Sequence, residues 1–152
     1  WADRTCRVAA MIKLPPDWSE VDVSDNPDDV EFMVRGPVTE YGYAPTVIAK
    51  RLPRLDEGIE VGMAMLLDPG LREDPSHRLI DVGEVMLAGY RAAVAVLTYN
   101  SRDRNITQML YYITPKELPT AYLLALMSAT PDFGPMAGAF ADIVASFQPK
   151  GH

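Results

Sequence analysis

Apolar side chains recur at helical spacing near the end of the sequence. They are three, four or seven positions apart, which places them on one face of an α-helix. The set consists of Phe133, Met136, Phe140, Ile143, Val144 and Phe147. Because a wide apolar stripe must pack against another element, we predict a helix over residues ~133–147 that lies on a sheet.

A second helical pattern lies in the middle of the chain. Its apolar positions are Leu55, Ile59, Met63, Leu66 and Leu67, and Pro69-Gly70 ends it. The spacing predicts a helix over residues ~55–67. Two glycines inside it weaken the helix by roughly 1 kcal/mol each relative to alanine, so tertiary packing must supply most of its stability.

Between these helices and before them, alternating or continuous apolar runs bounded by Pro, Gly, Asn and Asp predict strands. The predicted strands are 7–14, 18–23, 30–35 and 46–52, then 77–87, 90–99, 106–114 and 121–129. Short turns join the later strands, which favours antiparallel pairing. We therefore predict an α+β fold, with an antiparallel sheet of about 6–8 strands and two helices packed on it. No linker or repeat divides the chain, so 1–152 is expected to form a single domain with its core at ~8–149.

The composition and charge of the chain exclude some kinds of partner and bear on its location. A net charge of −7 and a pI of about 4.7 disfavour nucleic-acid binding. The apolar runs are too short to span a bilayer. The single cysteine, Cys6, cannot form an intramolecular disulfide, and the opening WADRTCRVAA lacks the apolar region of a signal peptide. A cytoplasmic location is favoured as the chain stands, and the cell envelope is the alternative if an N-terminal leader has been removed.

Candidates for catalysis and metal binding are weak. Ser76 and His77 are neighbours in the sequence, and adjacent strand residues point to opposite faces, so they are badly placed to share a proton. The acidic stretch at 22–31 lacks the glycine and terminal glutamate of a calcium-binding loop. We predict no catalytic residue, no metal site and no cofactor.

Aromatic and basic residues in loops are better candidates for recognition. Tyr41 and Tyr43 lie in the loop EYGYAP, where a packed core is less able to bury both. Arg102 and Arg104 lie in a turn predicted over 100–105. This turn is either a solvated turn or a contact for a small anion or a partner. Trp18 completes the candidate binding set, with a core position as its alternative. The eight methionines fit either core packing or an adaptable hydrophobic cleft.

Four stretches resemble the PsbP/Mog1-like fold, and within it the mycobacterial LpqN-type lipoprotein domain and the DcrB/DUF1795-type domains. They are LPPDW at 14–18, the helical pattern at 55–67, the hairpin EVMLAGYRAAVAVLTY at 84–99 and the ending at 122–147. The resemblance implies a binding or accessory module, and it offers no catalytic motif to place on these residues. This chain lacks a lipoprotein cleavage signature.

The leading hypothesis is a non-enzymatic accessory domain that recognises a protein partner or a small apolar ligand. Its recognition surface would use Tyr41, Tyr43 and the adjacent sheet. Two alternatives stay open: a chaperone or adaptor for secreted effectors that works as a homodimer, and an enzyme with a cavity site that carries no motif.

Overall fold

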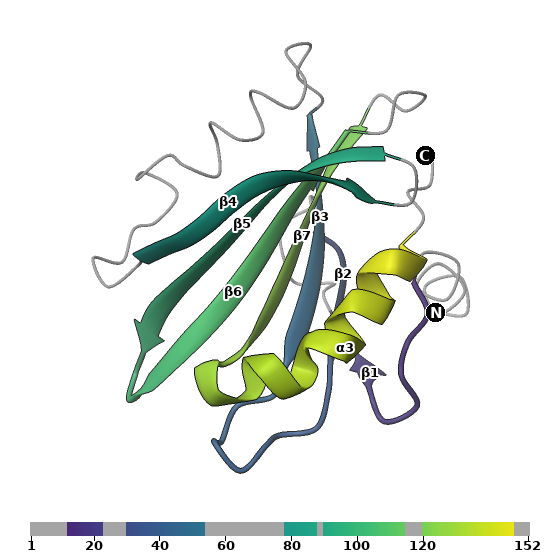
Figure 1. Ribbon diagram of the computed structural model, residues 1–152. Helices are drawn as coiled ribbons and strands as arrows, with labels where there is room; N and C mark the ends of the chain where they lie inside the picture. Colours follow the sequence, from purple (N-terminus) through teal and green to yellow (C-terminus); the bar gives the residue numbers. More distant parts are fainter. Residues whose placement is uncertain (1–11, 23–29, 54–77, 88–89, 115–119, 148–152) are drawn as a thin grey trace.

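The structure, a computed structural model, describes residues 12–22, 30–53, 78–87, 90–114 and 120–147. Within these ranges the chain forms one antiparallel sheet of seven strands and one helix, α3, that lies across a face of the sheet (Figure 1). The elements are β1 (Ser19–Glu20), β2 (Val30–Arg35), β3 (Thr46–Pro53), β4 (Arg78–Leu87), β5 (Tyr90–Ser101), β6 (Arg104–Ile113), β7 (Thr120–Ala129) and α3 (Thr130–Ser146). The predicted α+β class and antiparallel sheet are confirmed.

The strand order is β1-β2-β3-β7-β6-β5-β4. Hairpins account for every neighbouring pair except β3 with β7, whose ladder runs from Thr46 opposite Met127 to Pro53 opposite Thr120. This pairing joins the first strands of the chain to the last one. It also leaves the sheet with two very different edges, because β1 has two residues and β4 has ten.

We call the side of the sheet that α3 crosses the helix face. The helix packs mainly on β7 and β6. Phe140, Ile143 and Val144 are its buried residues, and Phe147 after its last turn packs edge-on against Tyr122, with ring centroids 5.5 Å apart. These side chains pack against a core that includes residues from the early strands and from the later strands of the chain. Its other members are Ile12, Trp18, Phe32, Val34, Val47, Ala49, Leu87, Ala92, Ile113, Leu124 and Leu126.

The helix begins at Thr130, three residues before the predicted start at 133. Pro131 lies in its first turn, where the missing N–H costs nothing because first-turn amides have no partner within the helix. Asp132 is also in the first turn, where a carboxylate interacts favourably with the helix dipole. The apolar period therefore identified the buried face, while the proline and the acidic residue mark the true start.

One sequence prediction falls on residues that the structure does not describe, and another needs correction. The described residues contain one helix where two were predicted, and the second, over residues ~55–67, lies outside the described residues. The strand predicted over 7–14 is wrong where it can be judged, since residues 12–14 form no strand. Instead, the Lys13 amide donates to Ser146 Oγ at 2.8 Å, so this backbone binds the end of α3.

Candidate functional site

The loop between β2 and β3, residues 36–45, has its own internal hydrogen bonds. The Gly42 amide donates to the Thr39 carbonyl at 2.9 Å, and the Thr39 amide donates to the Tyr43 carbonyl at 3.3 Å. Gly42 has a φ of 73°, a conformation that glycine adopts without steric cost. These bonds fold the candidate tyrosine segment into a compact turn.

The start of α3 holds this loop from one side. The Thr39 hydroxyl donates to Asp132 Oδ2 at 2.5 Å, and the Tyr41 amide donates to Thr39 Oγ1 at 3.3 Å. The threonine therefore links the loop backbone to a charged side chain of the helix. A hydrogen bond to a charged group is stronger than one between two neutral groups.

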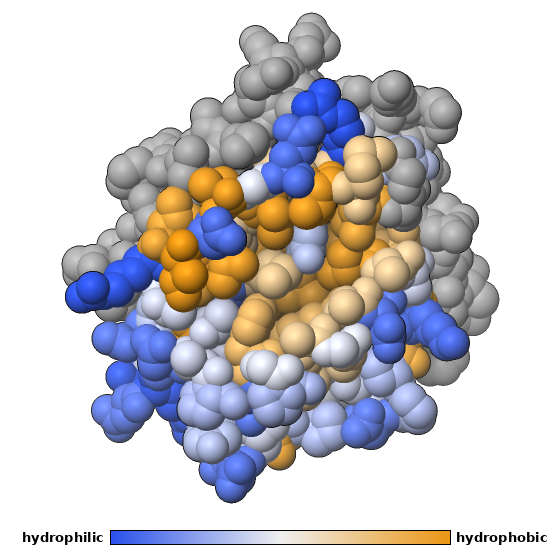
Figure 2. Space-filling view, in the orientation of Figure 1, coloured by the Kyte–Doolittle hydropathy of each residue, from blue (hydrophilic) through white to orange (hydrophobic). Residues whose placement is uncertain are grey.

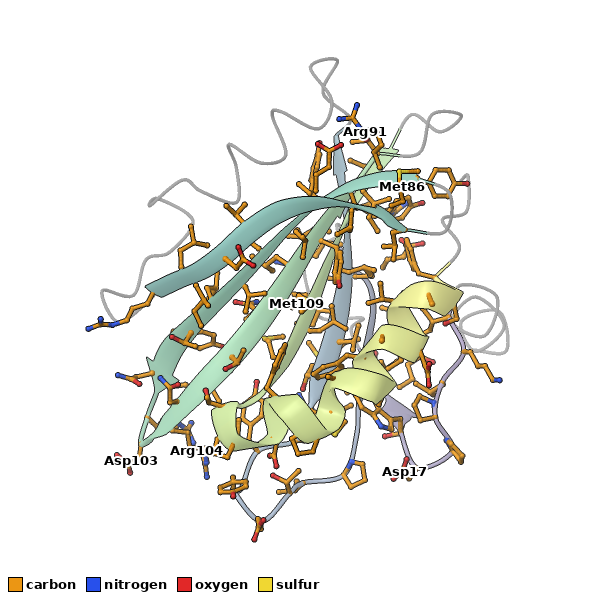
Figure 3. The ribbon with its side chains drawn as sticks, viewed as in Figure 1. Asp17, Met86, Arg91, Asp103, Arg104 and Met109 are labelled. Carbon is orange, nitrogen blue, oxygen red and sulfur yellow. The ribbon has the colours of Figure 1, made fainter. Side chains whose placement is uncertain are left out.

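The β5–β6 hairpin holds the loop from the other side. Arg104 Nε donates to the Tyr41 carbonyl at 3.1 Å. The guanidinium also lies over Gly42, where an added Cβ would come within 2.8 Å of Arg104 Nη2. Figure 3 shows Arg104 with Asp103 at the end of this hairpin. Tyr41 and Arg104, two residues predicted as separate candidates, are therefore in contact.

Tyr43 anchors the loop, and its side chain packs on the sheet. It is half-buried against a cluster that contains Ile106 and Met127, on the side of the sheet opposite the helix face. Its hydroxyl is hydrogen-bonded to Tyr99, and burial raises the pKa of Tyr43 above its usual value, an effect that the Arg35 charge partly offsets. Burial, together with the neighbouring Tyr43, raises the pKa of Tyr99 to about 12. Both phenols therefore stay neutral at ordinary pH and act as structural contacts.

Tyr41 is different, since its side chain is 45% exposed. Val38, earlier in the loop, is 68% exposed. Arg102 and Asp103 at the hairpin turn are exposed too, and Arg104 is half-buried. We call Val38, Tyr41, Arg102, Asp103 and Arg104 the tyrosine-loop surface.

The hairpin turn is tighter than predicted. Ser101 pairs with Arg104, so only residues 102–103 make the turn, where the sequence predicted a turn over 100–105. Arg102 has a φ of 58°, in the left-handed region that a non-glycine residue enters at a cost of about 1 kcal/mol. Glycine adopts this conformation without that cost, yet the position holds an arginine.

Trp18 does not belong to this surface. It is 7% exposed and packs edge-on against Phe140, with ring centroids 6.3 Å apart. Its indole also covers Gly36, where an added Cβ would lie 2.8 Å from Trp18 Cε2. The side chain is enclosed in the core, so the prediction of Trp18 as a binding residue is not carried further.

A second feature is an apolar strip on the helix face beyond α3. Val96 pairs with Met109 and Val94 pairs with Tyr111, and all four side chains are half-buried. By strand alternation they share the face of Ala92 and Ile113, which belong to the core under the helix. Figure 2 shows a hollowed apolar surface here, and Figure 3 places Met109 near the middle of the sheet. We call Val94, Val96, Met109 and Tyr111 the apolar strip.

Three residues that shape the site were not singled out from the sequence: Val38, Thr39 and Asp132. The position of Val38, between Pro37 and Thr39 in a predicted loop, indicates only weakly that its side chain is exposed. The Thr39–Asp132 contact joins positions 93 apart, and no local pattern indicates it. Among the residues that the structure describes, no three His, Cys, Asp or Glu side chains are grouped to hold a metal ion, and no helix is long and apolar enough to cross a membrane.

The strand order and the helix lying across the sheet define a PsbP/Mog1-like fold, as three solved structures show. LpqN of Mycobacterium tuberculosis, described as involved in cell envelope biogenesis, has a TM-score of 0.64 and 17% identity over 88% of this chain and 78% of that one. The PsbP of Synechocystis, CyanoP, has a TM-score of 0.62 and 14% identity over 91% and 85%. The Saccharomyces cerevisiae Ran-binding protein Mog1p has a TM-score of 0.58 and 13% identity over 90% and 88%.

At the level of sequence, no protein-family model and no curated protein matches the chain. The structural likeness confirms the fold that the four sequence stretches resembled. At these identities it defines the fold and leaves the function to be argued from the site.

Proposed function

We propose that this protein is a non-enzymatic accessory module that recognises a protein partner through the tyrosine-loop surface. The observation that carries the proposal is the hydrogen bond from Arg104 Nε to the Tyr41 carbonyl at 3.1 Å. It joins two exposed segments into one surface and fixes the loop that presents Tyr41.

The tyrosine loop is already ordered before a partner binds, which favours affinity. A loop that must be ordered on association loses affinity, because immobilising each flexible side chain costs about 0.5–1.5 kcal/mol. Here Thr39, Tyr43 and Arg104 already hold the loop. Tyrosine and arginine are also the residue types over-represented at binding hot spots.

The backbone of Arg102 gives independent support. Strained residues concentrate at functional sites, where the side chain is retained in spite of its cost. With φ at 58°, Arg102 keeps an exposed cation in the turn, two residues before Arg104, which donates to the Tyr41 carbonyl. A partner that fits would offer an apolar contact for Tyr41 and Val38 and a carboxylate for Arg102.

The fold is compatible with this role. Mog1p, one of the neighbours of this fold, is described as a Ran-binding protein. Such an analogy supports the class of function, protein recognition, and says nothing about which partner this chain has.

Affinity capture with matched variants tests the proposal. The wild-type protein, Tyr41→Ala and Met86→Ala would each be used to capture proteins from an extract of the source organism. Met86 is exposed and belongs to the edge strand β4, so it is a control for changes elsewhere on the surface. We expect a protein that the wild type and Met86→Ala retain and Tyr41→Ala loses. Equal recovery with all three baits, or no specific protein at all, would contradict the proposal.

The apolar strip favours a second candidate function, the binding of a small apolar ligand. The specific observation is that Val94, Val96 and Met109 are half-buried outside the clusters that form the packed core. Native mass spectrometry of protein isolated from its source would report a retained ligand directly. We expect Met109→Glu to abolish that retention and Tyr41→Ala to preserve it. Protein that carries no ligand under gentle isolation would remove this candidate.

A further inference from the structure

The face of the sheet opposite α3 carries an apolar row across four neighbouring strands. The strand register sets Met33 of β2 opposite Ile48 of β3, then Ile48 opposite Ala125 of β7, and Ala125 opposite Leu110 of β6. Met33, Ile48 and Leu110 are half-buried, so each keeps some surface in contact with solvent. Because neighbouring strands lie about 4.8 Å apart, the row is about 14 Å wide.

Two cations lie beside this row. Arg35 ends β2 and is exposed, and its Nη2 donates to Met33 Sδ at 3.9 Å. Lys50 is half-buried and lies two residues after Ile48, on the same face of β3. Within the part of the chain that the structure describes, neither cation forms an ion pair. We call Met33, Arg35, Ile48, Lys50 and Leu110 the basic sheet surface.

The charge of this surface is opposite to that of the chain, whose net charge is −7. Among the described strands, Glu20, Glu31 and Asp81 lie towards the helix face, and Glu84 lies on the opposite face, where Arg91 pairs with it at 2.6 Å. Charges farther apart than about 8 Å are largely screened at physiological ionic strength. A carboxylate in contact with the basic sheet surface is therefore attracted by Arg35 and Lys50.

The position of the row within the sheet limits the kind of partner that can bind it. β3, β7 and β6 each have a neighbouring strand on both sides, so their backbones are not open to a further strand. A partner must therefore use its side chains. An α-helix is about 10–12 Å across, which matches the width of the row, and α3 already packs on the other face in this way.

We propose that the partner of the tyrosine-loop surface also lays an acidic amphipathic helix on the basic sheet surface. Its apolar stripe would contact Ile48 and Leu110, and its carboxylates would lie beside Arg35 and Lys50. This inference rests on the proposed function and names the chemistry of the partner. Tyr43 connects the two surfaces, because it belongs to the tyrosine loop and packs on the same buried cluster as Ile48 and Leu110.

Charge reversal tests the proposal in the capture experiment. Arg35→Glu is compared with Arg78→Glu, since both arginines are exposed on strands and both changes alter the net charge equally. We expect Arg35→Glu to retain at least about tenfold less of the partner than wild type, and Arg78→Glu to retain as much. Retention by wild type should also fall as the NaCl concentration rises from about 0.05 to about 0.5 M.

The same baits separate this inference from the proposed function. If Tyr41→Ala loses the partner and Arg35→Glu retains it fully, the helix proposal is overturned and the tyrosine-loop surface stands. If wild type captures no specific protein, both are overturned.

Photo-cross-linking tests where the partner lies. In a Cys6→Ser background, a benzophenone is attached at Met33→Cys, with Met86→Cys at the far edge of the sheet as the control. We expect the Met33 label to join a partner segment that has an apolar stripe and carboxylates three or four positions apart, and the Met86 label to join none. A Met33 label that joins no partner, reacts only within this chain, or joins a segment without carboxylates would overturn the proposal.

Discussion

Two parts of the helix face differ in what covers them. Where α3 packs on the sheet, Leu124 and Leu126 of β7 and Ile143 of the helix are buried together in one core. On β5, farther along the same face, Val94 and Val96 are equally apolar and only half-buried. Leu124 and Leu126 lie on β7, on which α3 packs, whereas Val94 and Val96 lie on β5. The residue types are alike, so the difference in burial comes from the strands that the helix covers.

This comparison separates stability from function. The covered part holds the fold together, because burial of apolar surface is the main favourable term in folding. The uncovered part and the tyrosine-loop surface bury less apolar surface, so their exposed apolar residues require a different explanation. We explain them by binding.

The largest expected effect lies under the helix. Ile143 is fully buried on α3, so Ile143→Ala should lower the free energy of unfolding by about 3–4 kcal/mol through lost transfer energy and a cavity. Met109→Ala in the apolar strip should cost about 1 kcal/mol or less, since its side chain is already partly in water. Urea unfolding of both variants measures the difference. Equal losses would contradict the division of the helix face.

A smaller effect is expected where the core meets the loop. Gly36→Ala would push a methyl group against Trp18, whose Cε2 lies 2.8 Å from the added Cβ. Trp18 is enclosed by Phe140 and cannot move freely, so we expect a loss of about 1–3 kcal/mol. Thermal unfolding measures this loss. A variant as stable as the wild type would show that Trp18 has room to shift.

Loosening the tyrosine loop should have a moderate effect on stability. Asp132→Ala removes the acceptor of the Thr39 hydroxyl and a favourable charge at the helix start, which together contribute about 1–2 kcal/mol. Hydrogen exchange of the Tyr41 amide should become faster, because that amide donates to Thr39. Asp142→Ala, an exposed change on the same helix, is the control and should leave this exchange unchanged.

Arg102→Gly should separate stability from binding most clearly. Glycine relieves the left-handed backbone at φ 58°, so we expect a gain of a few tenths to about 1 kcal/mol in unfolding free energy. The same change removes the exposed cation, so the affinity for the protein partner should fall. Denaturant unfolding and a binding isotherm on one preparation measure both. A variant that gains stability and binds unchanged would remove Arg102 from the site.

The smallest effect concerns alkaline pH. The pKa of Tyr99 is raised to about 12 in the folded protein, from a usual value of 10. A raised pKa favours the neutral phenol, so its contribution is fully present below pH 10 and is lost as pH rises from about 10 towards 12. Ultraviolet titration should show a late-ionising tyrosine that Tyr99→Phe removes. The Tyr43 environment should loosen in the same range, because the two hydroxyls are hydrogen-bonded.

Much of the fold could be predicted because its strands and its last helix follow from local patterns of apolar and turn-forming residues. The strand at Val30–Arg35 agrees at both ends with its prediction, since Gly36-Pro37 ends it clearly. The last helix was predicted from its buried stripe and was missed only in its first turn. The β5–β6 turn was predicted too long, because no glycine marks the left-handed position that Arg102 occupies.

The site was less predictable, because it depends on contacts between distant segments. Tyr41 and Arg104 were chosen as loop residues, but their contact follows from the sheet order, which no local pattern contains. Trp18 shows the opposite problem. An aromatic residue after two prolines has the composition of a recognition residue, and only the packing of Phe140 and Gly36 around it shows that it belongs to the core.

Binding of the captured partner to purified protein tests the central claim most directly, with isothermal titration comparing wild type, Tyr41→Ala and Met109→Ala. We predict that Tyr41→Ala raises Kd about thirtyfold, the effect of losing a hot-spot tyrosine of about 2 kcal/mol. Met109→Ala should leave Kd unchanged. A partner that binds Tyr41→Ala as tightly as wild type would contradict the assignment of recognition to the tyrosine-loop surface.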